Sequence, residues 1–118
     1  MTRTPHDIFT AHASALVSGD VAKILEDYSE DALLLTADGP LRGKGAIGEF
    51  FTAALGALPE AEFTMGSTVF AGDALLLQWS ATSPKGKITD AVDTFVFADG
   101  KIRLQTAVFR LEPAQTGG

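Results

Sequence analysis

Asp93 is the clearest candidate for a functional residue, because it is an acidic side chain among apolar neighbours. It lies within the otherwise uncharged run 91–97 (AVDTFVF), which predicts a strand. Because side chains alternate across a strand, Asp93 shares a face with Phe95 and Phe97. A carboxylate on a face built for burial is costly unless it is protonated, paired or hydrogen-bonded, and acids placed in this way often mark binding or catalytic sites. The run therefore predicts a pocket with Asp93 in its wall.

His12 and Tyr28 are two further inward groups that could act on protons. His12 lies between Phe9 and Leu16 on the inward face of a predicted helix. An imidazole can donate a hydrogen bond or accept a proton near neutral pH. Tyr28 lies on the inner stripe of a second predicted helix, where a buried phenol needs a partner such as His12 or Asp93. A His12–Asp93 pair would form a titratable couple in the pocket. The alternatives are a core histidine and an aspartate hydrogen-bonded for structural reasons.

The elements that must position these groups divide the chain into a helical half and a strand half. Thr4-Pro5 predicts the start of the first helix and Ser18-Gly19 its end, and Asp20 can cap the second, shorter helix. A third helix is expected over about residues 46–58. Strands are expected at 32–36, 63–70, 74–82, 88–97 and 101–111. Hairpin-length links between the last four strands predict an antiparallel meander, so the chain is expected to form an α+β domain.

The composition excludes several classes of protein. The 118 residues predict a single domain over residues 1–118, and the net charge of −6 argues against binding to nucleic acid. There is no cysteine, and no carboxylate–histidine set has metal-ligand spacing, so neither a metal nor a cofactor is expected. Residues 43–48 (GKGAIG) fit a dinucleotide fingerprint but lack the required βαβ unit, so these glycines are expected to open a helix. No signal peptide or membrane-length apolar run is present, so a cytoplasmic protein with no membrane partner is expected.

Motifs spread over about residues 5–111 resemble one protein family. They are Gly19-Asp20, Tyr28-Ser29-Glu30-Asp31-Ala32, Gly43-Lys44-Gly45-Ala46-Ile47, Phe50-Phe51, Val92-Asp93-Thr94-Phe95, Asp99-Gly100-Lys101-Ile102 and Ala107-Val108-Phe109. The chain resembles the nuclear-transport-factor-2-like (NTF2-like) superfamily, in the branch of ketosteroid isomerases and SnoaL-like, polyketide-cyclase-like proteins. The resemblance implies a cone-shaped, cystatin-like fold in which a curved antiparallel sheet wraps on three N-terminal helices. An apolar cavity is implied at the open end.

The resemblance also assigns roles to particular positions. Asp93 aligns with the protonated acid of the isomerase oxyanion hole, and His12 stands where that oxyanion hole has a tyrosine. Phe51 replaces a second tyrosine of the same network. Thr36 stands at the position of the general-base carboxylate and cannot abstract a proton at neutral pH. Asp38 is expected to face solvent, so steroid isomerase activity is not expected.

The resulting hypothesis is a pocket for a small apolar carbonyl or enol compound. An isomerase or cyclase reaction would use His12 and Asp93, with Tyr28 orienting them. The expected substrate-binding residues are Trp79, Phe51, Phe95, Gln105 and Phe109. Trp79 and Phe109 could instead be plain core, and Gln105, which is expected to share a face with Arg103 and Ala107, could instead lie at an edge in solvent.

Two other functions remain open from the sequence. One is a non-catalytic dimerisation or ligand-binding module, and the other is an epoxide-hydrolase-like hydrolase. The outer face of the Asp93 strand, with Val92, Thr94 and Val96, is apolar enough to be buried by a partner subunit. Because relatives commonly pair through this face, a homodimer is expected.

Overall fold

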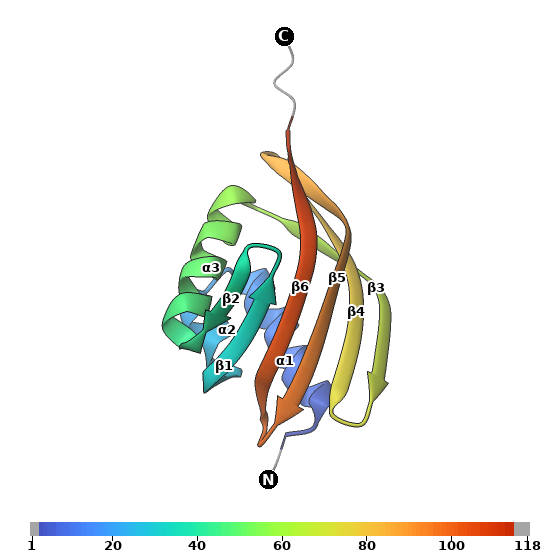
Figure 1. The fold of residues 1–118 in the computed structure, drawn as a ribbon. Helices are drawn as coiled ribbons and strands as arrows, with labels where there is room; N and C mark the ends of the chain where they lie inside the picture. Colours follow the sequence, from blue (N-terminus) through green and yellow to red (C-terminus); the bar gives the residue numbers. More distant parts are fainter. Residues whose placement is uncertain (1–2, 115–118) are drawn as a thin grey trace.

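A curved sheet with helices on one face makes up the fold of the computed structural model (Figure 1). The structure describes residues 3–114, which form three helices and six strands. None of these helices is long and apolar enough to cross a membrane. The elements are α1 (Pro5–Ser18), α2 (Val21–Glu26), β1 (Tyr28–Thr36), β2 (Gly39–Arg42), α3 (Gly43–Ala57), β3 (Glu62–Ala71), β4 (Ala74–Ser83), β5 (Gly86–Ala98) and β6 (Lys101–Pro113).

The strand order explains how distant segments meet at one site. The sheet runs β2-β1-β6-β5-β4-β3, and the meander from β3 to β6 is antiparallel as predicted. The last strand returns beside the first, and β1 and β6 are parallel, which was not predicted from the sequence. Hairpin links fix the direction of neighbouring strands, whereas a long connection leaves it open. The curved α+β fold is confirmed, with one parallel pair in the sheet.

The predicted ends of α1 are confirmed by its capping contacts. The hydroxyl of Thr4 accepts a hydrogen bond from the backbone N–H of Asp7 at 3.1 Å, and the Asp7 carboxylate accepts one from the N–H of Thr4 at 3.0 Å. Gly19 ends the helix with a φ of 73°. Helix α3 begins at Gly43, whose φ is 88°, so the glycine-rich segment opens a helix as expected. Its start lies three positions earlier than about residue 46.

Two local predictions were wrong. Tyr28 begins β1 instead of closing the second helix, because that helix is already capped at Asp27. The backbone carbonyl of Asp27 accepts a hydrogen bond from the N–H of Ile102, so the chain joins the sheet at this point. The short strand β2 was missed, because it begins with Gly39 and contains Pro40. Among the described residues β2 pairs with β1 alone, at the edge of the sheet, where proline is tolerated.

The hydrophobic core lies between the helices and the inner face of the sheet. Its fully buried members come from both layers and include Ile8, Ile24, Leu34, Ile47, Phe95 and Ile102. A smaller cluster formed by Leu58, Ala81, Ile88 and Ala91 lies beyond it, where α3 ends. Trp79 and Phe109 contact both clusters.

Candidate active site

A cavity of about 80 Å³ opens between α1, α3 and the inner face of the sheet. Almost all of its wall is apolar, and the polar side chains that reach it are His12, Asp93 and Gln105, together with the indole of Trp79. Met65, at 41% exposure, also lines the cavity, so the cavity reaches the surface beside β3. The apolar lining residues are Phe9, Leu16, Phe50, Phe51, Ala54, Leu55, Leu58, Phe63, Met65, Leu77, Ile88, Phe95, Ala107 and Phe109.

Asp93 is buried in the cavity wall, as the alternation of its strand predicted. Only 6% of the residue is exposed. The indole N–H of Trp79 donates to its Oδ1 at 3.0 Å, and the amide Nε2 of Gln105 donates to its Oδ2 at 2.9 Å. Burial raises the pKa of the Asp93 carboxyl, and these two hydrogen bonds oppose that rise. The group is therefore poised to exchange a proton closer to neutral pH than an ordinary aspartate.

Tyr28 belongs to the same hydrogen-bonded series but does not line the cavity. Its hydroxyl donates to Oε1 of Gln105, and the residue is 1% exposed. The predicted partners, His12 and Asp93, are therefore replaced by Gln105, because Tyr28 lies at the start of β1 beside β6. We call the series Trp79–Asp93–Gln105–Tyr28 the polar chain. Its members come from β4, β5, β6 and β1, which are neighbours in the sheet.

Gln105 faces the cavity together with Ala107 and Phe109, and an irregularity in β6 separates it from Arg103. The pairing with β5 shifts between Val96–Leu104 and Phe97–Ile102, and this leaves Arg103 exposed. Strict alternation had placed Arg103 and Gln105 on one face, which was wrong. Gln105 is 3% exposed and lines the cavity, so the solvent-edge alternative is excluded.

His12 is buried in an aromatic environment on α1. Its ring meets the rings of Tyr28, Phe51 and Phe95 edge-on, at centroid distances of 5.6, 6.1 and 5.5 Å. Burial lowers the pKa of His12 to about 4, and the charge of Asp27 opposes this shift. The imidazole is therefore neutral at pH 7. Its buried Nδ1 has no hydrogen-bond partner within residues 3–114, which is unusual for a buried polar atom.

His12 and Asp93 line the same cavity without touching through a hydrogen bond. Of the described side chains, those bonded to Asp93 are Trp79 and Gln105, and the acid that influences the pKa of His12 is Asp27. The direct couple expected from the sequence is therefore not formed. The two groups could act together only through a molecule lying between them.

Thr36 and Asp38 lie outside the cavity lining. The Thr36 hydroxyl donates to the carbonyl of Gly39 and accepts from the N–H of Asp38, both at 3.1 Å, so it stabilises the β1–β2 turn. Asp38 is exposed, as expected. Of the carboxylates in residues 3–114, Asp93 alone lines the cavity. The position of the isomerase general base is therefore occupied by Thr36, which is not a base and does not line the cavity.

The aromatic wall predicted from the sequence is present but larger than expected. Trp79, Phe51, Phe95 and Phe109 all line the cavity. The wall also includes four residues that were not predicted to line it, namely Phe9, Phe50, Phe63 and Met65. The spacing of Phe63 and Met65 on one strand was a usable signal, since alternate residues share a face. Within residues 3–114, no group of three or more histidine or acidic side chains is arranged to hold a metal ion.

Comparison with known proteins identifies the family. The sequence pattern of the SnoaL-like domain matches residues 9–105. This chain belongs to the SnoaL-like domain family. The NTF2-like fold and the polyketide-cyclase-like branch predicted from the sequence are thus confirmed at the level of family. No curated protein matches the sequence of this SnoaL-like protein.

Solved structures similar to this SnoaL-like protein share its fold at low sequence identity. An NTF2-like protein of unknown function from Burkholderia xenovorans LB400 is 18% identical, with a TM-score of 0.77, over 97% of this chain and 88% of that one. AclR from Streptomyces galilaeus, a candidate hydroxylase, is 16% identical with a TM-score of 0.77, over 90% and 88%. IdmH from Streptomyces antibioticus, a candidate polyketide cyclase, is 16% identical with a TM-score of 0.75, over 91% and 92%. At these identities the likeness establishes the fold alone.

Proposed function

We propose that this SnoaL-like protein binds a small, largely apolar molecule and holds its carbonyl or enol oxygen against Asp93. The observation that carries the proposal is one carboxylate, fixed by Trp79 and Gln105, in the wall of an otherwise apolar cavity. Apolar pockets with a few placed polar groups are the usual form of small-molecule sites. The apolar wall would supply affinity, and Asp93 would orient the bound molecule.

A reaction of the isomerase or cyclase type is the catalytic form of this proposal. Asp93 would exchange a proton with the ligand, because its raised pKa brings it closer to neutral pH. His12 would meet the ligand as a neutral imidazole from the α1 side of the cavity. The match to IdmH, a candidate polyketide cyclase, is compatible with such chemistry.

The volume of the cavity restricts the ligand. A cavity of about 80 Å³ is smaller than the roughly 150 Å³ engineered cavity that accepts benzene. The enclosed part therefore suits the oxygen-bearing end of a ligand. The rest would extend toward Met65 and Phe63, where the cavity reaches the surface.

Asp93→Asn tests the proposal in a binding screen of small cyclic ketones and alcohols, followed through the signals of Trp79, the one tryptophan of the chain. We expect the hydroxyl ligands of the wild type to lose about ten-fold or more in affinity, because a hydrogen bond from a hydroxyl to a charged carboxylate is worth about 1.5–3 kcal/mol. Asp38→Asn makes the same chemical change at an exposed site and should leave affinity unchanged. Equal affinities of wild type and Asp93→Asn would refute the role of Asp93. Unchanged binding in the double variant His12→Ala, Asp93→Ala would refute the site.

A non-catalytic module is the second candidate, and the exposed apolar outer face of the sheet favours it. Val108 is 62% exposed and Val69 54% exposed on that face. In this form the protein would bind a ligand or a second copy of itself without turnover. Ligand that is recovered chemically unchanged after prolonged incubation with the protein would favour this second candidate.

A further inference from the structure

The polar chain has a single direction, and that direction constrains Asp93. A tyrosine hydroxyl bonded to an amide oxygen must donate, so Tyr28 occupies Oε1 of Gln105. The other end of the same amide, Nε2, then faces Asp93 and can only donate. The indole of Trp79 is also a donor only. Both of these fixed neighbours of Asp93 therefore present hydrogens to its oxygens.

We propose that Tyr28 is a positioning residue that, through Gln105, keeps Asp93 a hydrogen-bond acceptor, so that the cavity selects ligands with a hydroxyl hydrogen. Enols, phenols and alcohols belong to this class, whereas ketones without an enol form do not. The inference rests on the proposed function and narrows it. Tyr28 acts at a distance, because it does not line the cavity, whereas Gln105 and Asp93 do.

The reverse arrangement leaves a buried group without a partner. If the Gln105 amide were turned over, Asp93 would have to be protonated in order to donate to Oε1. Nε2 would then donate to Tyr28, whose own hydrogen would need another acceptor. Among residues 3–114, the buried hydroxyl of Tyr28 bonds to Gln105, so turning the amide over would remove the acceptor that its hydrogen has in the structure. A buried donor left unpaired is costly, and this favours the observed direction.

No other ionisable group among the described residues forms a hydrogen bond that would keep Asp93 an acceptor. His12 lines the same cavity from α1 but forms no hydrogen bond to Asp93. Asp27, whose charge acts to raise the pKa of both His12 and Tyr28, forms an ion pair with Arg3 at 2.9 Å. The protonation state of Asp93 is therefore set by its burial, by the polar chain and by the ligand itself.

The first test compares cyclopentanol with cyclopentanone, which have similar size and shape but differ in the hydroxyl hydrogen. The Trp79 indole N–H signal in nuclear magnetic resonance reports binding beside Asp93. We expect the wild type to bind cyclopentanol about ten-fold more tightly, the equivalent of one hydrogen bond. Equal affinity, or tighter binding of the ketone, would overturn the inference while leaving the proposed function in place. Binding of neither compound would overturn the proposed function as well.

The second test follows the same indole signal against pH without any ligand. Tyr28→Phe frees Oε1 of Gln105, so the amide can turn and Asp93 loses an N–H donor. We expect the titration midpoint of Asp93 to rise by roughly one pH unit in this variant. At pH values between the midpoint of the wild type and that of the variant, the preference of the variant for cyclopentanol should fall. Gln105→Leu removes the same donor directly and should move the midpoint in the same direction.

Ile24→Val controls for loss of stability, because Ile24 is fully buried and lies outside the cavity lining. We expect it to lower the unfolding temperature without moving the midpoint. If Tyr28→Phe lowers stability and leaves both the midpoint and the ligand preference unchanged, Tyr28 is only a core residue and the inference is wrong.

Discussion

Burial acts in opposite directions on the two ionisable groups of the cavity. It lowers the pKa of His12 to about 4 and raises the pKa of Asp93, because in each case it disfavours the charged form. The cavity thus drives both side chains toward neutrality. Two hydrogen bonds to the Asp93 carboxyl offset the cost of its burial, whereas Nδ1 of His12 has no hydrogen-bond partner within the described residues. Of the two, His12 is the group for which a ligand would satisfy an unmet hydrogen bond.

At the residue scale, His12 should make stability depend on pH. Its pKa is 6.5 in the ordinary state and about 4 in the fold, so the unfolded chain binds more protons between these values. Stability is therefore expected to fall as the pH drops from about 6.5 to about 4, by an amount on the order of 3 kcal/mol. Urea denaturation across this range measures the effect.

His12→Phe is the matched variant, since it keeps an aromatic ring and removes the titrating group. Its loss of stability over the same range should be smaller. Asp93 changes the stability in the opposite direction as the pH falls, because its raised pKa makes protonation favour the folded state. This contribution is the same in the wild type and in His12→Phe, so it does not affect the comparison. If wild type and His12→Phe lose equal stability, His12 is not buried in its neutral form.

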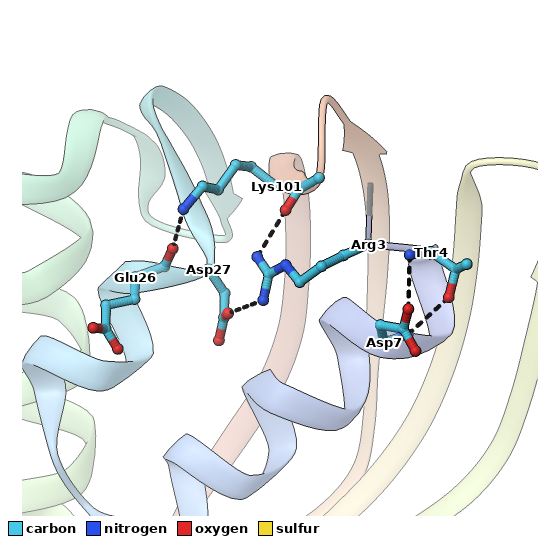
Figure 2. A network of polar contacts seen from close by, with 7 residues as sticks. Arg3, Thr4, Asp7, Glu26, Asp27 and Lys101 are labelled. Atoms are coloured by element: carbon cyan, nitrogen blue, oxygen red, sulfur yellow. Dashed lines mark hydrogen bonds and ion pairs between the residues drawn. The ribbon is translucent and has the colours of Figure 1, made fainter. Parts of the chain in front are cut away.

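At the scale of elements, Arg3 connects the start of α1 to the two segments beside it (Figure 2). Its Nη1 donates to Oδ1 of Asp27 at 2.9 Å, and its Nη2 donates to the carbonyl of Gly100 at 2.7 Å. Asp27 caps α2 and is 4% exposed, and Gly100 lies in the β5–β6 turn. Nearby, Lys101 donates to the carbonyl of Glu26 at 2.6 Å. Because α1 carries His12, these contacts help to hold His12 against the sheet.

Arg3→Ala should destabilise the fold by about 2 kcal/mol. It leaves the buried Asp27 without its cation, and the expected cost stays below that of a fully buried pair because the Arg3 side chain is 35% exposed. Arg3→Lys should recover only part of the loss, since an ammonium lacks the planar fork that reaches both acceptors. Thermal or urea denaturation provides the measurement.

Lys87→Ala is the control for this prediction. It removes an exposed pair with Glu112 at 3.7 Å and should cost less than about 0.5 kcal/mol. Equal losses for Arg3→Ala and Lys87→Ala would show that the Arg3 contacts do not anchor α1.

At the scale of the whole molecule, the face of β3–β6 opposite α1 carries no helix among the described residues (Figure 1). Val92 pairs with Val108, and Thr94 pairs with both Leu76 and Thr106, so these side chains form one continuous surface. Leu76 is 42% exposed and Val108 62% exposed. Contiguous apolar surface of this kind is typical of a protein–protein interface. We therefore expect a homodimer that pairs through this face.

Val108→Glu should convert the dimer to a monomer, because it places a charge at the centre of the expected interface. Light scattering coupled to gel filtration measures the mass directly. Val17→Glu introduces the same charge on α1, at a residue that is 75% exposed, and should leave the dimer intact. A wild type that is monomeric at working concentration, or equal behaviour of the two variants, would contradict the expectation.

Local features of the sequence determined much of the fold. Thr4-Pro5 and Gly19 marked the ends of α1 through capping chemistry, which depends only on nearby residues. The alternation of residues 91–97 placed Asp93 inward, because a strand inverts its side chains at every step. The alternation failed at Arg103, where the pairing of β5 and β6 shifts and local periodicity gives no warning.

The partners of the site residues were decided only by the tertiary structure. Asp93 meets Trp79 and Gln105, and Tyr28 meets Gln105, because β4, β5, β6 and β1 lie side by side. That order depends on β6 returning parallel to β1 over a long connection, which short-range patterns do not specify. His12 therefore shares the cavity with Asp93 without pairing with it. Residue type and periodicity set which side chains face inward, and the packing of distant strands set what each one touches.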